Sequence, residues 1–135
     1  KYNMTNISAT IGTEQLKEID NLNKKNIKHA KIFEKIVKNN KYLKHSIPLK
    51  NSKSTYWLFN LFTKNSKVLI NKFSKAGIEA SKVHLPNYLH PIFNSSNVKL
   101  SGCEEFYKNI LHIPCGWWLK KKDINKIRKI LETSR

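Results

Sequence analysis

The longest regular pattern in this sequence is a stripe of apolar residues that extends from Met4 to Asn39. Its members recur mostly at intervals of three to five positions, the spacing that places side chains along one face of an α-helix. They are Ile7, Ile11, Leu16, Ile19, Leu22, Ile27, Ala30, Phe33, Ile36 and Val37. We expect a helix that is interrupted near Asn23–Asn26, with Thr5 or Asn6 as its N-cap. A helix of about ten turns has to lie against a large surface.

Strand patterns follow this helix. Residues 42–49 and 54–63 are separated by the turn-like sequence KNSK and predict an antiparallel pair. The second segment is rich in aromatic residues and largely apolar on both faces, which is typical of a strand covered on both sides. Residues 78–83 predict a third, shorter strand.

The remaining segments have helical patterns. A helix is expected from Asn65 or Ser66 to a left-handed Gly77, a short helix begins at Cys103, and a last helix contains Asp123. The order of these elements predicts an α+β domain, with a three-stranded antiparallel sheet, flanking helices and a long N-terminal helix.

The charge of the chain suggests one alternative function. The sequence has 26 basic and nine acidic residues, a formal charge of +17, which raises nucleic acid as a partner. Only Arg128 and Arg135 are arginine, the residue whose planar guanidinium matches phosphates and base edges, and this argues against such a partner. In the alternative, Trp117 and Trp118 stack on single-stranded bases beside lysines 120–122. In the simpler interpretation, the tryptophans anchor the last helix and the lysines face solvent.

The sequence contains no membrane or secretion signal. No apolar run approaches the roughly 20 residues that span a bilayer, and the N-terminus lacks the order of a secretory signal. Cys103 and Cys115 do not have the spacing of metal ligands. We expect a cytoplasmic protein with reduced thiols.

The segment 84–102 is rich in Pro, Asn, Ser and His, and loops of this length in compact domains are more often functional than idle. His84, His90, His112 and Cys115 lack the spacing of a zinc site. Two interpretations of Cys115 remain open: a nucleophile paired with a histidine, or a buried apolar side chain. With four glycines in the chain, no glycine-rich phosphate loop is present.

Four segments carry a family resemblance. They are KYNMTNISATIGTEQLKEIDNLNKKN, STYWLFNLFTKNSKVLINKFSKAGIEA, VHLPNYLHPIF and CEEFYKNILHIPCGWWLKKKDINKI. In this order and spacing they resemble the C-terminal third of the DegT/DnrJ/StrS family, the pyridoxal-phosphate-dependent aminotransferases of nucleotide-linked keto sugars. The resemblance covers nearly the entire chain.

The resemblance implies the small C-terminal domain of a fold-type-I transferase that depends on pyridoxal 5'-phosphate (PLP). Residues 1–40 would form a long interdomain and interface helix region, and residues 41–135 the small α+β domain. The large N-terminal PLP-binding domain would be absent. The full-length protein would aminate a nucleotide-linked keto sugar in amino-sugar and polysaccharide biosynthesis, with glutamate as amino donor.

The resemblance also implies a set of binding residues. Family members are homodimers with active sites at the subunit interface, and the segment that matches Lys1–Asn3 reaches toward the cofactor phosphate of the partner. Lys1 and Asn3 are therefore expected to bind PLP, since an ammonium, an amide and a helix N-terminus all suit a phosphate dianion. His84, Tyr88 and His90 match the loop near the sugar nucleotide and are expected to bind substrate, although His90 alternatively only braces the loop.

The chemistry of transamination is expected to lie outside this chain. No lysine among the 135 residues matches the Schiff-base motif of the family, and no catalytic residue is assigned. The resemblance implies that this lysine and the acidic partner of the pyridine nitrogen lie in the large domain. We expect an inactive fragment, with an exposed apolar patch along Ile7–Ile19 where the large domain packs.

Overall fold

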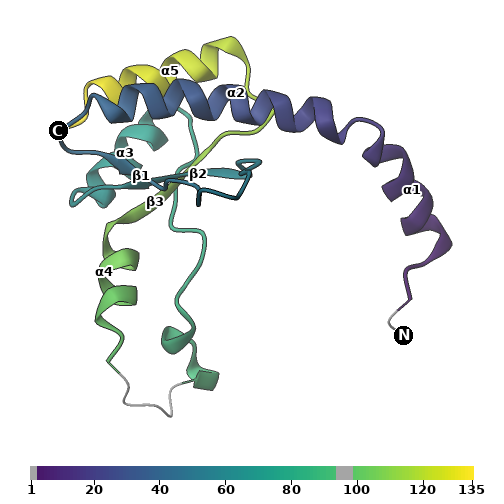
Figure 1. Ribbon diagram of the computed structural model, residues 1–135. Coiled ribbons are helices and arrows are strands. Elements are labelled where there is room, and N and C mark those ends of the chain that lie inside the picture. The colour runs from purple at the N-terminus through teal and green to yellow at the C-terminus, as the bar shows by residue number, and fades with distance from the viewer. Residues whose placement is uncertain (1–2, 94–98) are drawn as a thin grey trace.

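The computed structural model describes residues 3–93 and 99–135 of the chain. An antiparallel sheet of three strands in the order β1-β2-β3 lies beneath two long, adjacent helices, α2 and α5 (Figure 1). The strands are β1 (Lys44–His45), β2 (Leu58–Phe62) and β3 (Ile110–Pro114). The helices are α1 (Asn6–Leu16), α2 (Ile19–Lys38), α3 (Ser66–Lys75), α4 (Ser101–Asn109) and α5 (Lys121–Glu132), with 3₁₀ turns η1 (Asn87–Leu89) and η2 (Pro91–Phe93). The expected α+β architecture is confirmed.

The N-terminal stripe forms two helices, but the predicted site of the interruption was wrong. The break falls at Lys17 and Glu18, whose backbone N–H groups close tight turns onto the carbonyls of Glu14 and Gln15 at 3.2 and 3.1 Å. Residues 23–26 continue the helix because asparagine is only mildly unfavourable in a helix, and α2 has a packed apolar face. Thr5 is the N-cap, as one of the two predictions has it: its hydroxyl accepts a hydrogen bond from the Ser8 N–H at 3.2 Å.

Helix α1 extends away from the remainder of the described residues, and none of its residues is buried (Figure 1). Ile7, Ile11 and Leu16 are 75, 55 and 68% exposed. The prediction of an exposed apolar patch along this stripe is confirmed. None of the described helices is both long enough and apolar enough to cross a bilayer.

The core lies between the sheet and the helices α2, α3 and α5. Phe33 of α2 packs edge-on against Phe59 of β2, with 5.6 Å between the ring centroids. The other fully buried large side chains are Val37, Leu61, Phe73, Leu111, Ile113, Cys115, Ile127 and Leu131. Helix α2 therefore shares one core with the sheet and α5.

Two expectations about the sheet were wrong. Strand β2 is not covered on both sides: Phe59 and Leu61 are buried, whereas Leu58, Asn60 and Phe62 are half-buried, the alternation of a strand with one open face. The expected third strand, residues 78–83, forms only a single bridge between Ser81 and His112. The third strand is β3, a short apolar run in which periodicity alone does not separate a strand from a buried turn.

The predicted end of the helix before residue 78 is confirmed in detail. Gly77 has a φ of 71°, the left-handed conformation that glycine adopts most readily. Its N–H donates to the Ser74 carbonyl at 2.9 Å, and the Ile78 N–H donates to the Phe73 carbonyl at 3.0 Å, which is the Schellman pattern. Residues 78–83 follow this turn and meet β3 at its central residue, through the bridge between Ser81 and His112.

Candidate functional site

The open face of the sheet carries the polar groups of this region. In the β2–β3 register, Asn60 lies directly opposite His112, so both side chains are on the face that the core does not cover. Asn60 is half-buried and its amide donates to the Ser46 hydroxyl at 3.3 Å. His112 is 9% exposed.

His84 lies at the edge of this open face, between two aromatic rings. Its ring centroid is 6.1 Å from that of Trp57 and 6.2 Å from that of His112, the latter in an edge-on arrangement. His84 and Trp57 are exposed. A solvent-facing imidazole is thus held near an aromatic surface, an arrangement able to hydrogen-bond a polar ligand that packs against the indole.

The three residues before His84 are fixed to neighbouring elements. Ser81 and His112 exchange two backbone hydrogen bonds of 3.1 and 2.8 Å. The Lys82 ammonium donates to the Tyr107 carbonyl, and to that of Lys108 at 2.8 Å, at the C-terminal end of α4, where the helix dipole favours a cation. The Val83 N–H donates to Nδ1 of His112 at 3.1 Å. His84 therefore projects from an anchored segment.

The electrostatics of this segment follow from burial. Burial lowers the pKa of His112, and the neighbouring His84 lowers it further, against an opposing contribution from the Ser81 carbonyl. Burial also lowers the pKa of Lys82, with a smaller contribution from Lys67. His112 is accordingly neutral at pH 7. Of the two histidines, His84 is the one whose imidazole is accessible to solvent.

Tyr88 and His90 lie further along the loop. Tyr88 is half-buried in η1, where burial, Cys103 and Glu104 raise its pKa, so it lies near α4. His90 is exposed and its backbone closes both 3₁₀ turns: its N–H donates to Asn87 at 3.0 Å and its carbonyl accepts from Phe93 at 2.9 Å. Within residues 3–93 and 99–135, no side-chain hydrogen bond or ring contact joins either residue to His84. Both remain predicted substrate residues, and His90 has the contacts that the bracing alternative expects.

The predicted phosphate-binding segment is only partly described. Lys1 lies outside the described residues. Asn3 is exposed and stands two residues before Thr5, the N-cap of α1. The first turn of α1 has no acidic residue, so the partial positive charge of its N-terminus is not neutralised there.

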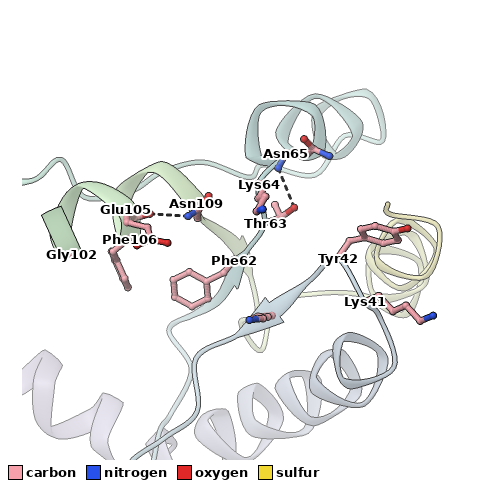
Figure 2. A pocket seen from close by; sticks show the side chains of 11 residues that line it. Lys41, Tyr42, Phe62, Thr63, Lys64, Asn65, Gly102, Glu105, Phe106 and Asn109 are labelled. Carbon is pink, nitrogen blue, oxygen red and sulfur yellow. Dashed lines mark hydrogen bonds between the residues drawn. The ribbon is translucent and has the colours of Figure 1, made fainter.

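An open groove of about 780 Å³ lies between the β1–β2 end of the sheet and α4 (Figure 2). Phe62 and Phe106 meet in its wall, with ring centroids 5.3 Å apart. Lys41, Lys44 and Lys64 line it, near the start of α3. In Figure 2 the backbone N–H of Asn65 donates to the Thr63 hydroxyl, at 3.2 Å. The groove is basic and aromatic, but none of the predicted site residues line it.

The three tryptophans of the chain line a separate, smaller cavity of about 240 Å³ beside the start of α2. Trp117 and Trp118 are 47 and 52% exposed, with edge-on rings 5.9 Å apart. The expectation that they anchor the last helix was wrong, since the buried residues of this region are Cys115, Ile124 and Ile127. The tight turn at Gly116 explains the difference, because the Trp118 ring stacks on it within 2.0 Å of where a Cβ would lie.

Cys115 is a packed core residue. It is 0% exposed, its Sγ lies 3.5 Å from the Asn26 carbonyl, and burial raises its pKa to about 12. A thiol that stays protonated is not a nucleophile, so the apolar interpretation holds. Among the described residues, no three His, Cys, Asp or Glu side chains are grouped so as to hold a metal ion.

Sequence reasoning missed two members of the site, Trp57 and His112. The sequence pattern places Trp57 only in an aromatic strand, and His112 only in a loose set of potential ligands. The signal for His112 was its position in ILHIP, where a polar residue interrupts an apolar run. A buried histidine in such a run requires hydrogen-bond partners, which here are supplied by residues 81–83.

Comparisons with known proteins agree on one family. The model of the DegT/DnrJ/EryC1/StrS aminotransferase family matches residues 1–132. The chain is 25% identical over 140 residues to the UDP-4-amino-4,6-dideoxy-N-acetyl-beta-L-altrosamine transaminase of Helicobacter pylori, covering 98% of this chain and 37% of that protein.

Solved structures share the fold. AtS13 from Actinomadura melliaura superposes with a TM-score of 0.92 at 21% identity, over 100% of this chain and 36% of that one. The sugar aminotransferase CalS13 from Micromonospora echinospora superposes with a TM-score of 0.88 at 22% identity, over 96% and 35%. The chain thus spans little more than a third of the length of these relatives. The comparisons do not support the nucleic-acid alternative.

Proposed function

This chain belongs to the DegT/DnrJ/EryC1/StrS aminotransferase family, and we propose that it forms the C-terminal part of an enzyme that aminates a nucleotide-linked keto sugar. The observation that carries this proposal is the family match across residues 1–132. It is supported by the Helicobacter relative, a transaminase whose name specifies a UDP-linked amino sugar. The working enzyme would need the other two thirds of the family's length.

The cofactor of this proposal is PLP, which supplies an electron sink for amino transfer when it is bound. Asn3 fits a contact with its phosphate, because an exposed amide next to an uncompensated helix N-terminus is a suitable partner for a dianion. Lys1 would contribute a point charge to the same phosphate. Asn3 lines neither the basic groove nor the tryptophan-lined cavity, so other parts of a dimer would have to enclose the cofactor.

His84 has the strongest structural support as a substrate-binding residue. It is exposed, lies beside Trp57, and follows a segment that is anchored by the backbone of Ser81 and Val83 and by the side chain of Lys82. An imidazole in this setting orients a hydroxyl or phosphate oxygen by hydrogen bonding, without itself taking part in amino transfer. Tyr88 would add a hydroxyl from η1, and His90 would act mainly by closing the turns of the loop.

Two further features belong to the same proposal. Glutamate is the amino donor that the family resemblance implies. A homodimer would bring Lys1 and Asn3 of one subunit to the cofactor of the other, which suits the position of α1, an element with no buried residue on its own chain.

The test uses the full-length protein with bound cofactor. His84→Ala should raise KM for the keto-sugar nucleotide about tenfold, the effect of losing one good hydrogen bond, with kcat changed much less. His45→Ala is the matched control, because His45 stacks on Phe59 toward the core, and its KM should stay unchanged. A protein that binds PLP and glutamate but aminates no member of a panel of keto-sugar nucleotides would contradict the proposed function.

A further inference from the structure

We propose that His112 is a positioning residue for His84: its Nδ1 accepts the Val83 N–H and so fixes the direction in which the next residue leaves the sheet. This inference rests on the proposed function for the role of His84. It assigns to a buried strand residue a part in substrate binding through another side chain.

The contacts of His112 define its hydrogen-bonding state. Nδ1 lies 3.1 Å from the Val83 nitrogen and 3.1 Å from the Ser81 carbonyl oxygen. The Ser81 carbonyl already accepts the backbone N–H of His112 at 2.8 Å. With Nδ1 unprotonated, the Val83 N–H has an acceptor and the Ser81 carbonyl keeps its backbone donor, at the cost of an acceptor–acceptor contact between Nδ1 and that carbonyl oxygen. With Nδ1 protonated, two N–H groups would face each other and the Val83 donor would lose its partner. His112 is therefore the neutral tautomer with its proton on Nε2.

The Val83 contact matters because the strand pairing ends before it. Residues 78–83 form one bridge, Ser81 with His112, and no ladder continues toward His84 in the described residues. Lys82 contacts α4 through its side chain, whose ammonium donates to the Lys108 carbonyl. Val83 is thus the last residue before His84 whose backbone donates a hydrogen bond to the sheet, and the acceptor of that bond is a side chain. A side chain can be replaced without altering the backbone pairing, which makes the role testable.

The second contact of His112 is with His84 itself. The two ring centroids lie 6.2 Å apart in an edge-on arrangement, and the ring centroid of Trp57 lies 6.1 Å from that of His84. Because His112 is 9% exposed and lies in the central pairing of the sheet, its ring is a packed neighbour for the exposed imidazole of His84. His112 thereby limits the rotamers of His84 as well as the backbone that carries it.

Three variants of the full-length holoenzyme separate this role from general packing. In His112→Asn the amide oxygen takes the place of Nδ1, whereas in His112→Gln it lies further out, near the place of Nε2, and His112→Leu has no acceptor. Hydrogen exchange at the Val83 amide should stay near wild type in the Asn variant. It should accelerate about tenfold in the Gln and Leu variants, as for the loss of one hydrogen bond. KM for the keto-sugar nucleotide should rise in the same two variants, with kcat nearly unchanged.

The wild-type protein supplies a readout that requires no variant. The ¹⁵N chemical shifts of His112 should show an unprotonated Nδ1 and a protonated Nε2 at pH 7. A protonated Nδ1, or Val83 exchange that is equal in all four proteins, overturns the proposal. If His84→Ala raises KM but His112→Gln does not, the positioning role is wrong and the proposed site stands. If His84→Ala leaves KM unchanged, it is the proposed function of His84 that fails, while the tautomer and exchange data still decide the anchoring by His112.

Discussion

At the scale of single residues, Tyr56 combines an unusual backbone conformation with a hydrogen bond between two elements. Its φ is 51°, a left-handed conformation that is rare for an aromatic residue and costs on the order of 1 kcal/mol. Its hydroxyl donates to the Glu34 carboxylate at 2.6 Å. This charge-assisted hydrogen bond joins the segment that precedes β2 to helix α2. The strained conformation is therefore accompanied by a contact between two elements, at the residue that precedes Trp57.

Tyr56→Phe should lower the free energy of unfolding by about 1–2 kcal/mol at pH 8, because the half-buried carboxylate loses a donor. Burial and the Glu34 carboxylate raise the pKa of Tyr56 from 10.0 to about 12. A raised pKa in the folded state means that this stability is complete below pH 10 and is lost between pH 10 and 12. Urea unfolding at pH 8 and at pH 11.5 should thus show a difference between wild type and variant that shrinks at the higher pH. Tyr42→Phe, at an exposed tyrosine, is the control, and an equal effect there would contradict the prediction.

At the scale of elements, α1 and α5 have opposite energetic roles. Helix α5 buries Ile124, Ile127 and Leu131 in the core, whereas α1 buries none of its residues. Stability should therefore depend on α5 and hardly at all on α1.

The prediction uses the same substitution in both helices of the 135-residue chain. Ile127→Ala should lower the free energy of unfolding by about 2–5 kcal/mol, because it opens a cavity in a fully buried site. Ile11→Ala should change it by less than about 0.5 kcal/mol, because the side chain is already exposed. Urea unfolding followed by circular dichroism measures both, and comparable losses would show that α1 is packed in solution.

The same elements show how far the sequence predicts this fold. The long helical stripe, the Gly77 helix end and the last helix were predictable because each has a local signal that tertiary packing reinforces. Strand β3 was not, because five residues are too few to show a period. At the site, the loop with His84 could be found from composition and resemblance. The sequence could not place its partners Trp57 and His112 beside it, because they come from separate strand regions that meet only in the folded sheet.

At the scale of the whole molecule, the charge of +17 and the apolar face of α1 act against each other. The positive charges repel one another over about 10 Å at 0.1 M salt, and less at higher ionic strength. The apolar attraction between exposed faces persists in salt. The 135-residue chain should therefore self-associate more strongly as salt is added.

Light scattering between about 20 mM and 500 mM salt measures this association. The Debye length falls several-fold over this range of salt concentration. The double variant Ile7→Ser, Ile11→Ser should stay monomeric, because it removes two of the three exposed large apolar side chains of α1. Association that decreases with salt would instead indicate contacts between charged groups. Ile92→Ser is a control outside α1, at a residue that is 83% exposed.

The order of the strands has a consequence for how the chain reaches its structure. Strand β2 pairs with β3, but residues 63–109, including α3 and α4, lie between them in the chain. Closing so long a loop loses conformational entropy before the strand pairing compensates for it. We expect α2 and the β1–β2 turn to form early, and the sheet to be completed in the rate-limiting step. The open face of the sheet, with His84 and His112, would then be the last part of the molecule to form during folding.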